Sequence, residues 1–264
     1  MTKGTALITG ASSGIGAVYA EKLASRGFDL IIVARDFGRL SALSKRLSKD
    51  HGIAVTPLPA DLSRSADLDK ILEKLRGDHS LSLLVNCAGI GPKGAVLSSE
   101  MESLLDMVHL NVDVLHALTV TAAKAFAERG EGTIVNIASV VALMPEHFNP
   151  TYVASKAFVL ALTQALAVEL KPKGVTIQAV LPGFTRTEIF DRAGLDVNVI
   201  PSEMMMEAGE MVEAALSGLD RGELVTIPSL AETALWDRFD AARGALAPYL
   251  SLQHAAARYG GKTP

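Results

Sequence analysis

The feature that most constrains this 264-residue chain is a regular alternation of short apolar runs with longer helical stretches. Each run is almost continuously apolar and is bounded by turn residues, as expected for strands buried on both faces of a sheet. Strands that alternate with helices favour right-handed crossovers and a doubly wound sheet. The sequence therefore predicts an α/β fold with a parallel seven-stranded sheet and helices on both faces. The predicted strands are 5–9, 29–34, 53–59, 83–86, 133–138, 175–181 and 224–227, and the predicted helices are 14–26, 37–49, 65–76, 99–129 and 151–171.

No repeat, low-complexity stretch or Pro/Gly/Ser-rich linker divides the chain, so residues 1–264 are expected to form one domain. Within it, residues 190–210 lack a clean period and contain a Met204–Met206 run. They are interpreted as a substrate lid, although these methionines fit a core-facing helix equally well. Residues 229–264 form an Ala- and Leu-rich tail, predicted to be helical and to pack on the domain or on a partner subunit.

Composition excludes several classes of protein. The net charge of −4 and the lack of a basic stripe argue against nucleic-acid binding. The single cysteine, Cys87, excludes an intrachain disulfide, fits a reducing compartment and is interpreted as a core residue, so a cytoplasmic location is expected. No apolar run reaches the length of a membrane span without a charge, histidine or proline. No His/Cys/Asp/Glu cluster has metal-ligand spacing, so no metal is expected.

A glycine-rich turn follows the first predicted strand and opens the first predicted helix, at Thr9–Gly16. Glycines let the backbone approach a diphosphate closely, and the helix N-terminus offers unpaired N–H groups to it. This context predicts a dinucleotide-binding turn, with an ordinary strand-to-helix turn as the alternative. The residues assigned to the turn are Gly10, Ser12, Ser13, Gly14, Ile15 and Gly16.

Arg35 directly follows the second predicted strand, where a dinucleotide fold holds the adenosine ribose. An arginine there accommodates a 2′-phosphate, whereas an acidic residue accepts hydrogen bonds from a 2′-hydroxyl. The adjacent Asp36 could instead reach the ribose. NADP(H) is therefore favoured over NAD(H), which stays possible, and a solvated surface arginine is the alternative.

Tyr152 and Lys156 stand four residues apart on a predicted helix, so they share one face. A cation beside a phenol favours the phenolate and lowers the phenol pKa, as a general acid/base near neutral pH requires. Ser139 closes the fifth predicted strand, at the sheet edge where such folds bind ligands.

These segments together resemble the short-chain dehydrogenase/reductase family, in its single-domain, Rossmann-type branch, from about residue 3 to residue 187. The resemblance implies a catalytic set of Asn111, Ser139, Tyr152 and Lys156. Asn111 would interrupt its helix locally and hold a water of a proton relay; a polar helix-packing residue is the alternative. The resemblance also implies cofactor contacts by Asp61 and Leu62 at the adenine, by Asn86, Ala88 and Gly89 beside the adenosine ribose, by Tyr152 and Lys156, and by Pro182, Gly183, Thr185 and Thr187 at the nicotinamide.

The implied reaction transfers a hydride between the nicotinamide and a small-molecule carbonyl or secondary alcohol, which the apolar lid candidates suggest is lipophilic. Two alternatives stay open: an NAD(H)-dependent alcohol dehydrogenase of the same family, and a non-catalytic NADP(H)-sensing protein. Relatives usually associate through the helices that carry Asn111 and Tyr152, so the resemblance implies a homodimer or homotetramer.

Overall fold

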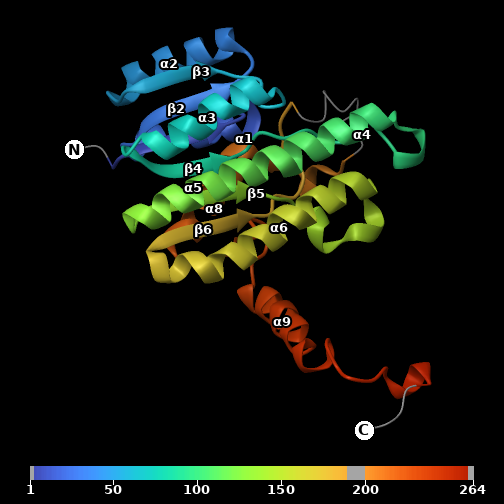
Figure 1. The fold of residues 1–264 in the computed structure, drawn as a ribbon. Helices are drawn as coiled ribbons and strands as arrows, with labels where there is room; N and C mark the ends of the chain where they lie inside the picture. Colours follow the sequence, from blue (N-terminus) through green and yellow to red (C-terminus); the bar gives the residue numbers. More distant parts are fainter. Residues whose placement is uncertain (1–2, 189–199, 261–264) are drawn as a thin grey trace. The chain divides into compact units, whose positions relative to one another are not determined.

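A single parallel sheet forms the centre of the computed structural model, which describes residues 3–188 and 200–260 (Figure 1). Its seven strands follow the order β3-β2-β1-β4-β5-β6-β9, and every neighbouring pair is parallel. This confirms the predicted doubly wound α/β fold. The strands are β1 (Thr5–Thr9), β2 (Asp29–Ala34), β3 (Val55–Pro59), β4 (Leu81–Asn86), β5 (Gly132–Ile137), β6 (Val175–Val180) and β9 (Val225–Thr226).

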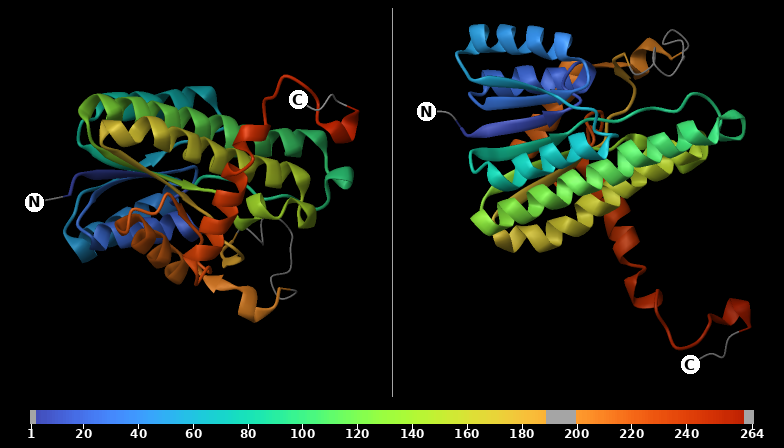
Figure 2. Two further views of the ribbon diagram at one scale, coloured as in Figure 1. Left: turned by 90° about the horizontal axis from the view of Figure 1, so that it is seen from below. Right: turned by 45° about the horizontal axis from the view of Figure 1, so that its top comes forward.

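Burial on both faces explains why the strands are continuously apolar. Successive side chains of β1 point to opposite faces: Ala6 and Ile8 pack in one core cluster, and Leu7 packs in the other. The first cluster lies under α1, α2 and α8, and the second lies under α3 and α5. Figure 2 shows these two helical layers on either side of the sheet.

Most helices that cover the sheet start close to their predicted positions, whereas α8 has no counterpart among the predicted helices. The helices of the described residues up to 228 are α1 (Gly14–Ser25), α2 (Phe37–His51), α3 (Ser65–Gly77), α4 (Met101–Val108), α5 (Leu115–Arg129), α6 (Pro150–Leu170) and α8 (Ala208–Asp220).

The predicted helix over 99–129 is interrupted. A π-helical segment, His109–Val114, separates α4 from α5 and carries Asn111. Single π-helical turns inside α-helices are common at functional sites.

Part of the predicted lid lies outside the described residues, namely 190–199. After it, residues Ser202–Met204 form a 3-10 turn, and β8 (Met206–Glu207) pairs with β7 (Thr185–Arg186). Helix α8 begins directly after β8, so the described part of the predicted lid, residues 200–210, connects to a helix that covers the sheet.

Helix α6 is strongly apolar along its length. With the 3-10 turn that follows, it is the one segment among the described residues long and apolar enough to cross a membrane, with a mean hydropathy of 1.5. It packs on β6 and carries buried polar residues, as a core helix does. Only 39% of its apolar window is buried, however, so much of the apolar surface of α6 faces outward.

Residues 229–264 separate from residues 1–228 as a compact unit of their own. This tail contains the predicted helix, α9 (Thr233–Gly244), followed by short 3-10 turns. None of the α9 residues is buried.

Candidate active site

The turn between β1 and α1 is shaped so that backbone, not side chains, lines it. Gly10 has a φ of 69°, and a Cβ there would lie 2.9 Å from the Ala88 backbone nitrogen. A Cβ at Gly16 would lie 2.4 Å from the Gly10 carbonyl oxygen. Side chains at these two positions would therefore force the backbone apart.

The N-terminus of α1 is suited to an anion. Its first turn carries no acidic residue, and the side chain of its N-cap, Ser13, does not cap the N–H groups of the helix. Its leading N–H groups and positive dipole end therefore suit a phosphate. Ser12 and Ile15 complete the turn, with Ile15 packed against the core. The turn thus fits the diphosphate of a dinucleotide.

Thr9 was not predicted as a site residue, yet it fixes the facing loop. Its Oγ1 accepts hydrogen bonds from the Cys87 and Ala88 N–H groups at 3.0 and 3.1 Å, and donates to the Val85 carbonyl at 3.4 Å. The loop after β4 is thereby tied to the glycine turn. The position of Thr9, just before Gly10, was the available sequence signal.

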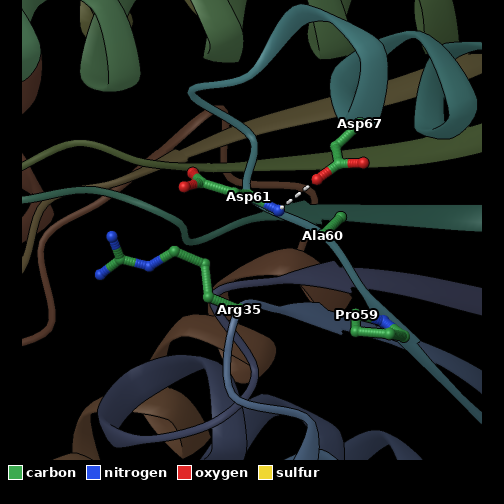
Figure 3. Close-up of a pocket in the computed structure, with 5 residues that line it drawn as sticks. All are labelled: Arg35, Pro59, Ala60, Asp61 and Asp67. Atoms are coloured by element: carbon green, nitrogen blue, oxygen red, sulfur yellow. Dashed lines mark hydrogen bonds between the residues drawn. The ribbon is translucent and has the colours of Figure 1, made fainter.

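An open pocket lies beside the carboxyl end of β2, lined by Arg35, Pro59, Ala60, Asp61 and Asp67 (Figure 3). The Asp61 carboxylate accepts a hydrogen bond from the Ser63 backbone N–H. The Asp61 backbone N–H donates a hydrogen bond to the Asp67 carboxylate. The pocket thus brings together Arg35 and Asp61, two of the residues expected to bind the cofactor, with Asp67.

Leu62 does not line this pocket. Its side chain is 5% exposed and packs in the core cluster under α3 and α5. Its predicted adenine contact is therefore not supported at the side chain, because the strand end turns that residue inward.

The two basic residues near β2 differ in their partners. Arg39 Nη1 contacts both carboxylate oxygens of Glu188 at 2.8 Å, and Asp36 caps α2 by accepting from Arg39 N–H. Arg35, in contrast, has no ion pair or hydrogen bond within the described ranges. The Arg35 guanidinium is therefore available to a ligand, and the Asp36 carboxylate is already engaged.

Asn86 supports the site from within. Its amide nitrogen donates to Thr119 Oγ1 and to Asn136 Oδ1, at 3.0 and 2.9 Å, and Asn136 donates to Thr163 Oγ1 at 3.0 Å. All four side chains are buried. The Asn86 side chain thus points into this network, not toward a ligand, and links β4 to β5, α5 and α6.

Tyr152 and Lys156 lie in the first two turns of α6, which Asn149 begins by accepting N–H bonds from Thr151 and Tyr152. The Lys156 ammonium donates to the Ile137 carbonyl at 3.0 Å and lies 5.7 Å from the centre of the Tyr152 ring. Lys156 is only 7% exposed. The end of β5 therefore fixes the ammonium beside the phenol ring.

Ser139 follows β5 and faces the same tyrosine. Its Oγ accepts from Val141 N–H and donates to the Pro182 carbonyl, both at 3.3 Å. The Ser139 hydroxyl also acts to lower the pKa of the Tyr152 phenol. Ser139, Tyr152 and Lys156 therefore share one site.

The pKa of the Tyr152 phenol is raised in this structure, whereas the sequence predicted that it would be lowered. Burial raises the pKa of the phenol to about 12, and the opposing contribution comes from Ser139, not from Lys156. Burial also lowers the pKa of the Lys156 ammonium to about 8. The cation lies over the ring face, where burial of both groups outweighs their attraction.

Cys87 is a thiol held in the same interior. Burial raises its pKa to about 12, and it packs against the core cluster of β1. A thiol that resists ionisation is a poor nucleophile, in line with the expectation that Cys87 is a core residue.

Asn111 uses its whole side chain to hold the loop after β4. Its Oδ1 accepts from Ile90 N–H and its Nδ2 donates to the Ile90 carbonyl, both at 2.9 Å, with a longer bond to Ser155. A Cβ at Gly89 would lie 3.0 Å from Asn111 Oδ1 and 3.8 Å from Lys156 Nζ. Asn111, Gly89 and Lys156 are thus brought together.

The segment after β6 closes the site from the other side. Pro182 receives the Ser139 bond through its carbonyl, and Thr185 is buried and donates to the exposed Gly183. A Cβ at Gly14 would lie 3.2 Å from the Thr187 side chain. This segment therefore reaches from Ser139 to the glycine turn. No group of three metal-ligating side chains occurs among the residues that the structure describes.

Several known proteins resemble this chain in sequence. The short chain dehydrogenase family model matches residues 4–198. Human 17-beta-hydroxysteroid dehydrogenase type 3 is 33% identical over 80% of this chain and 67% of its own length. Very-long-chain 3-oxoacyl-CoA reductase of Anas platyrhynchos is 30% identical over 70% of this chain and 60% of its own. The chain spans 58–67% of the length of the hydroxysteroid dehydrogenases it matches.

Solved structures match nearly the whole chain. A short-chain dehydrogenase from Sphingobium yanoikuyae in complex with NADPH is 49% identical, with a TM-score of 0.93 over 96% of this chain and 98% of that one. A bulky-bulky ketone specific alcohol dehydrogenase from Comamonas testosteroni is 44% identical, with a TM-score of 0.90 over 98% of this chain and 99% of that one. The chain therefore belongs to the short-chain dehydrogenase/reductase family.

Proposed function

We propose that this oxidoreductase is NADP(H)-dependent and transfers a hydride between the nicotinamide and the carbon of a lipophilic ketone or secondary alcohol. The observation that carries the proposal is the convergence of Ser139, Tyr152 and Lys156 at the end of β5. The glycine turn between β1 and α1 supplies a fitting diphosphate site at the same edge of the sheet.

The preference for NADP(H) is supported by the charges around the end of β2. Arg35 borders the pocket and keeps its charge available, whereas Asp36 is engaged as a helix cap. A 2′-phosphate therefore finds a cation there, and a 2′-hydroxyl lacks the acidic partner that it would use. The Sphingobium relative was solved with NADPH.

Bound nicotinamide supplies or accepts the hydride. In carbonyl reduction, Tyr152 donates its proton to the substrate oxygen as negative charge develops there. Ser139 donates a second hydrogen bond to that oxygen, turning its hydroxyl away from the Pro182 carbonyl. The Val141 N–H holds Ser139 Oγ in place for this role.

Lys156 and Asn111 support the proton transfer. The Lys156 ammonium, fixed by the Ile137 carbonyl, places positive charge beside the phenol and would hold the ribose of a bound nicotinamide cofactor. Asn111 holds Ile90 and so fixes the loop that borders Lys156. A water at the π-helical segment would let protons reach Lys156 and then Tyr152.

A lipophilic substrate is supported by the loops that border Ser139 and Tyr152. Phe148, from the loop before α6, contacts Phe184, from the loop after β6, with ring centroids 6.3 Å apart. Met144 stands four residues before Phe148, and Met204 stands two residues before Met206, whose N–H donates to the Phe184 carbonyl; both methionines are about half exposed. The Comamonas relative is described as specific for bulky-bulky ketones, and the human relative as a hydroxysteroid dehydrogenase.

Two alternatives remain distinguishable. An NAD(H)-dependent alcohol dehydrogenase would use the same catalytic residues. The affinities of Arg35→Gln for NADPH and NADH, described below, distinguish it from the proposed enzyme. A non-catalytic NADP(H) sensor would need no acid/base, and the Tyr152 comparison separates that alternative.

A homo-oligomer is supported by the outward face of α6. Ala154, Ala161, Ala165 and Val168 are exposed at intervals of seven, four and three residues, so they form one apolar face. Val168 is 77% exposed. We infer that a second copy covers this face. The cytoplasmic location expected from the sequence stays a prediction.

Tyr152→Phe removes only the hydroxyl. We expect kcat/KM for ketone reduction to fall by about 10³-fold, the size of a general-acid contribution, while NADPH affinity changes by less than about threefold. Absorbance of NADPH and fluorescence titration measure the two quantities. Tyr249→Phe, on an exposed tail residue, is the matched control. Undiminished turnover in Tyr152→Phe contradicts the mechanism.

The raised pKa of Tyr152 determines the pH dependence in each direction. Alcohol oxidation needs the phenolate, whose fraction rises about tenfold per pH unit below the pKa, whereas ketone reduction needs the phenol, which persists. We expect kcat/KM for oxidation to rise steadily between pH 6 and 8, and kcat/KM for reduction to stay level. Most of this window lies below the Lys156 pKa of about 8, so most of the lysine stays charged, and about half of it is still charged at pH 8. A plateau in oxidation from pH 6 upward would mean a low phenol pKa.

Arg35→Gln tests the cofactor preference. We expect the Kd of NADPH to rise by about 10- to 100-fold, because a charge-assisted phosphate contact is lost, and the Kd of NADH to change little. Arg46→Gln removes an equal charge from α2, the helix that follows Arg35, and serves as control; Arg46 pairs with Glu21. Equal loss of both cofactors, or none, in Arg35→Gln excludes the proposed role.

A further inference from the structure

The π-helical segment that carries Asn111 also contacts a second loop at the same edge of the sheet. Its first residue, His109, places Nε2 3.3 Å from the carbonyl oxygen of Ser63, 46 positions earlier in the chain. Ser63 lies in the loop after β3, two residues beyond Asp61, which lines the open pocket beside β2 (Figure 3). Since Asn111 holds the loop after β4, one segment is in contact with both loops.

The loop after β3 is shaped by short-range hydrogen bonds. The Asp61 carboxylate accepts from the Ser63 N–H at 3.1 Å, and the Asp61 carbonyl accepts from the Arg64 N–H at 2.9 Å. The Asp61 N–H donates to Asp67, in the first turn of α3, at 3.2 Å. Among the residues that the structure describes, the His109 contact is the one hydrogen bond that joins this loop to a helical segment other than α3. Beyond β3 and α3, His109 is therefore what fixes the loop.

Both partners of the His109 ring can only accept hydrogen bonds. Nδ1 lies 3.2 Å from Asp113 Oδ2, and Nε2 faces the Ser63 carbonyl oxygen. A neutral imidazole carries one N–H and one lone pair, so it can satisfy only one of these oxygens, whereas an imidazolium donates to both. In the neutral ring the N–H goes to the charged carboxylate, because charge-assisted bonds are the stronger ones, and the Ser63 bond is lost.

We propose that His109 is a positioning residue for the cofactor, which as an imidazolium joins Asp113 to Ser63 and so holds Asp61 at the pocket. When the ring loses its proton, the loop after β3 is released, and NADP(H) must order it on binding, at a cost in affinity. The inference rests on the proposed binding of NADP(H) and adds a dependence of that binding on pH. Ketone kinetics at saturating NADPH do not contain this effect, because it lies in the affinity for the cofactor.

Carboxylates predominate on the segments that meet at His109. The titratable groups on the elements around it are Glu102 and Asp106 on α4, Asp113 on the π-helical segment, Asp61, Asp67 and Arg64 next to Ser63, Lys93 on the loop after β4, His116 on α5, and Tyr152 and Lys156 on α6. The two α6 groups belong to the catalytic site, on the side of Asn111, and the His116 ring contacts Phe158. Within the described ranges, Asp113 is the residue that pairs with the His109 ring, so a change at Asp113 tests the inference most sharply.

The variant Asp113→Asn separates the proton from the contact. Its amide can donate to His109 Nδ1, so a neutral ring keeps its Nε2–H for the Ser63 carbonyl. We expect the Kd of NADPH for the parent, divided by that for Asp113→Asn at the same pH, to rise about three- to tenfold from pH 6 to pH 8, because one hydrogen bond of the loop is lost. The division removes the titration of the 2′-phosphate, which both proteins share. Fluorescence titration of the full chain measures both Kd values.

Two ring substitutions complete the set. His109→Phe keeps a planar ring without N–H groups, so we expect its Kd for NADPH to match that of the parent at pH 8 and to exceed it at pH 6. His116→Phe makes the same change two turns along the helix, where the ring contact with Phe158 can persist, and should keep the pH dependence of the parent. A constant ratio of parent to Asp113→Asn, or a parent-like pH dependence in His109→Phe, overturns the inference.

Hydrogen exchange without cofactor provides a second readout. The N–H groups of residues 60–66 should exchange more slowly in Asp113→Asn than in the parent at pH 8, and at similar rates in the two proteins at pH 6. Equal exchange at pH 8 would also overturn the inference. A parent that binds NADPH without the expected ratio overturns this inference alone, whereas a parent that binds no NADPH at either pH overturns the proposed function as well.

Discussion

The buried ammonium of Lys156 is the constraint on which the site depends. An unpaired charge is costly in a protein interior, so this group must hold a hydrogen bond. The Ile137 carbonyl at the end of β5 provides it, at 3.0 Å. That bond places α6 against the sheet edge, with Tyr152 one turn before Lys156 and Ser139 two residues after Ile137. The catalytic geometry thus follows from where a strand ends and a helix begins.

A second, polar layer holds this edge rigid. The buried amides of Asn86 and Asn136 join β4 to β5, and Thr9 ties β1 to the loop after β4. Asn111 then fixes the other end of that loop through Ile90. Buried polar networks of this kind specify one arrangement, because every broken bond leaves a desolvated group. The backbone beside the glycine turn is therefore positioned before any ligand arrives.

Much of the fold and part of the site could be predicted from sequence, because they follow from local pattern. Continuous apolar runs indicated the sheet, and the glycine spacing indicated the turn. What escaped depends on contacts between distant segments: Leu62 turns into the core, Asn86 points inward, and Arg39 pairs with Glu188 across 149 positions of sequence. The raised pKa of Tyr152 escaped too, because spacing on a helix shows which groups are near but not how deeply they are buried.

The central claim is that Ser139 and Tyr152 together bind the reacting oxygen beside the nicotinamide. A crystal structure of the enzyme with NADP(H) and a bulky ketone or alcohol tests it most directly. The account predicts the substrate oxygen within about 2.6–3.2 Å of both hydroxyls, with the diphosphate on the turn of Gly10 and Gly16. An oxygen bound by other groups, with Tyr152 and Ser139 out of reach, would contradict it.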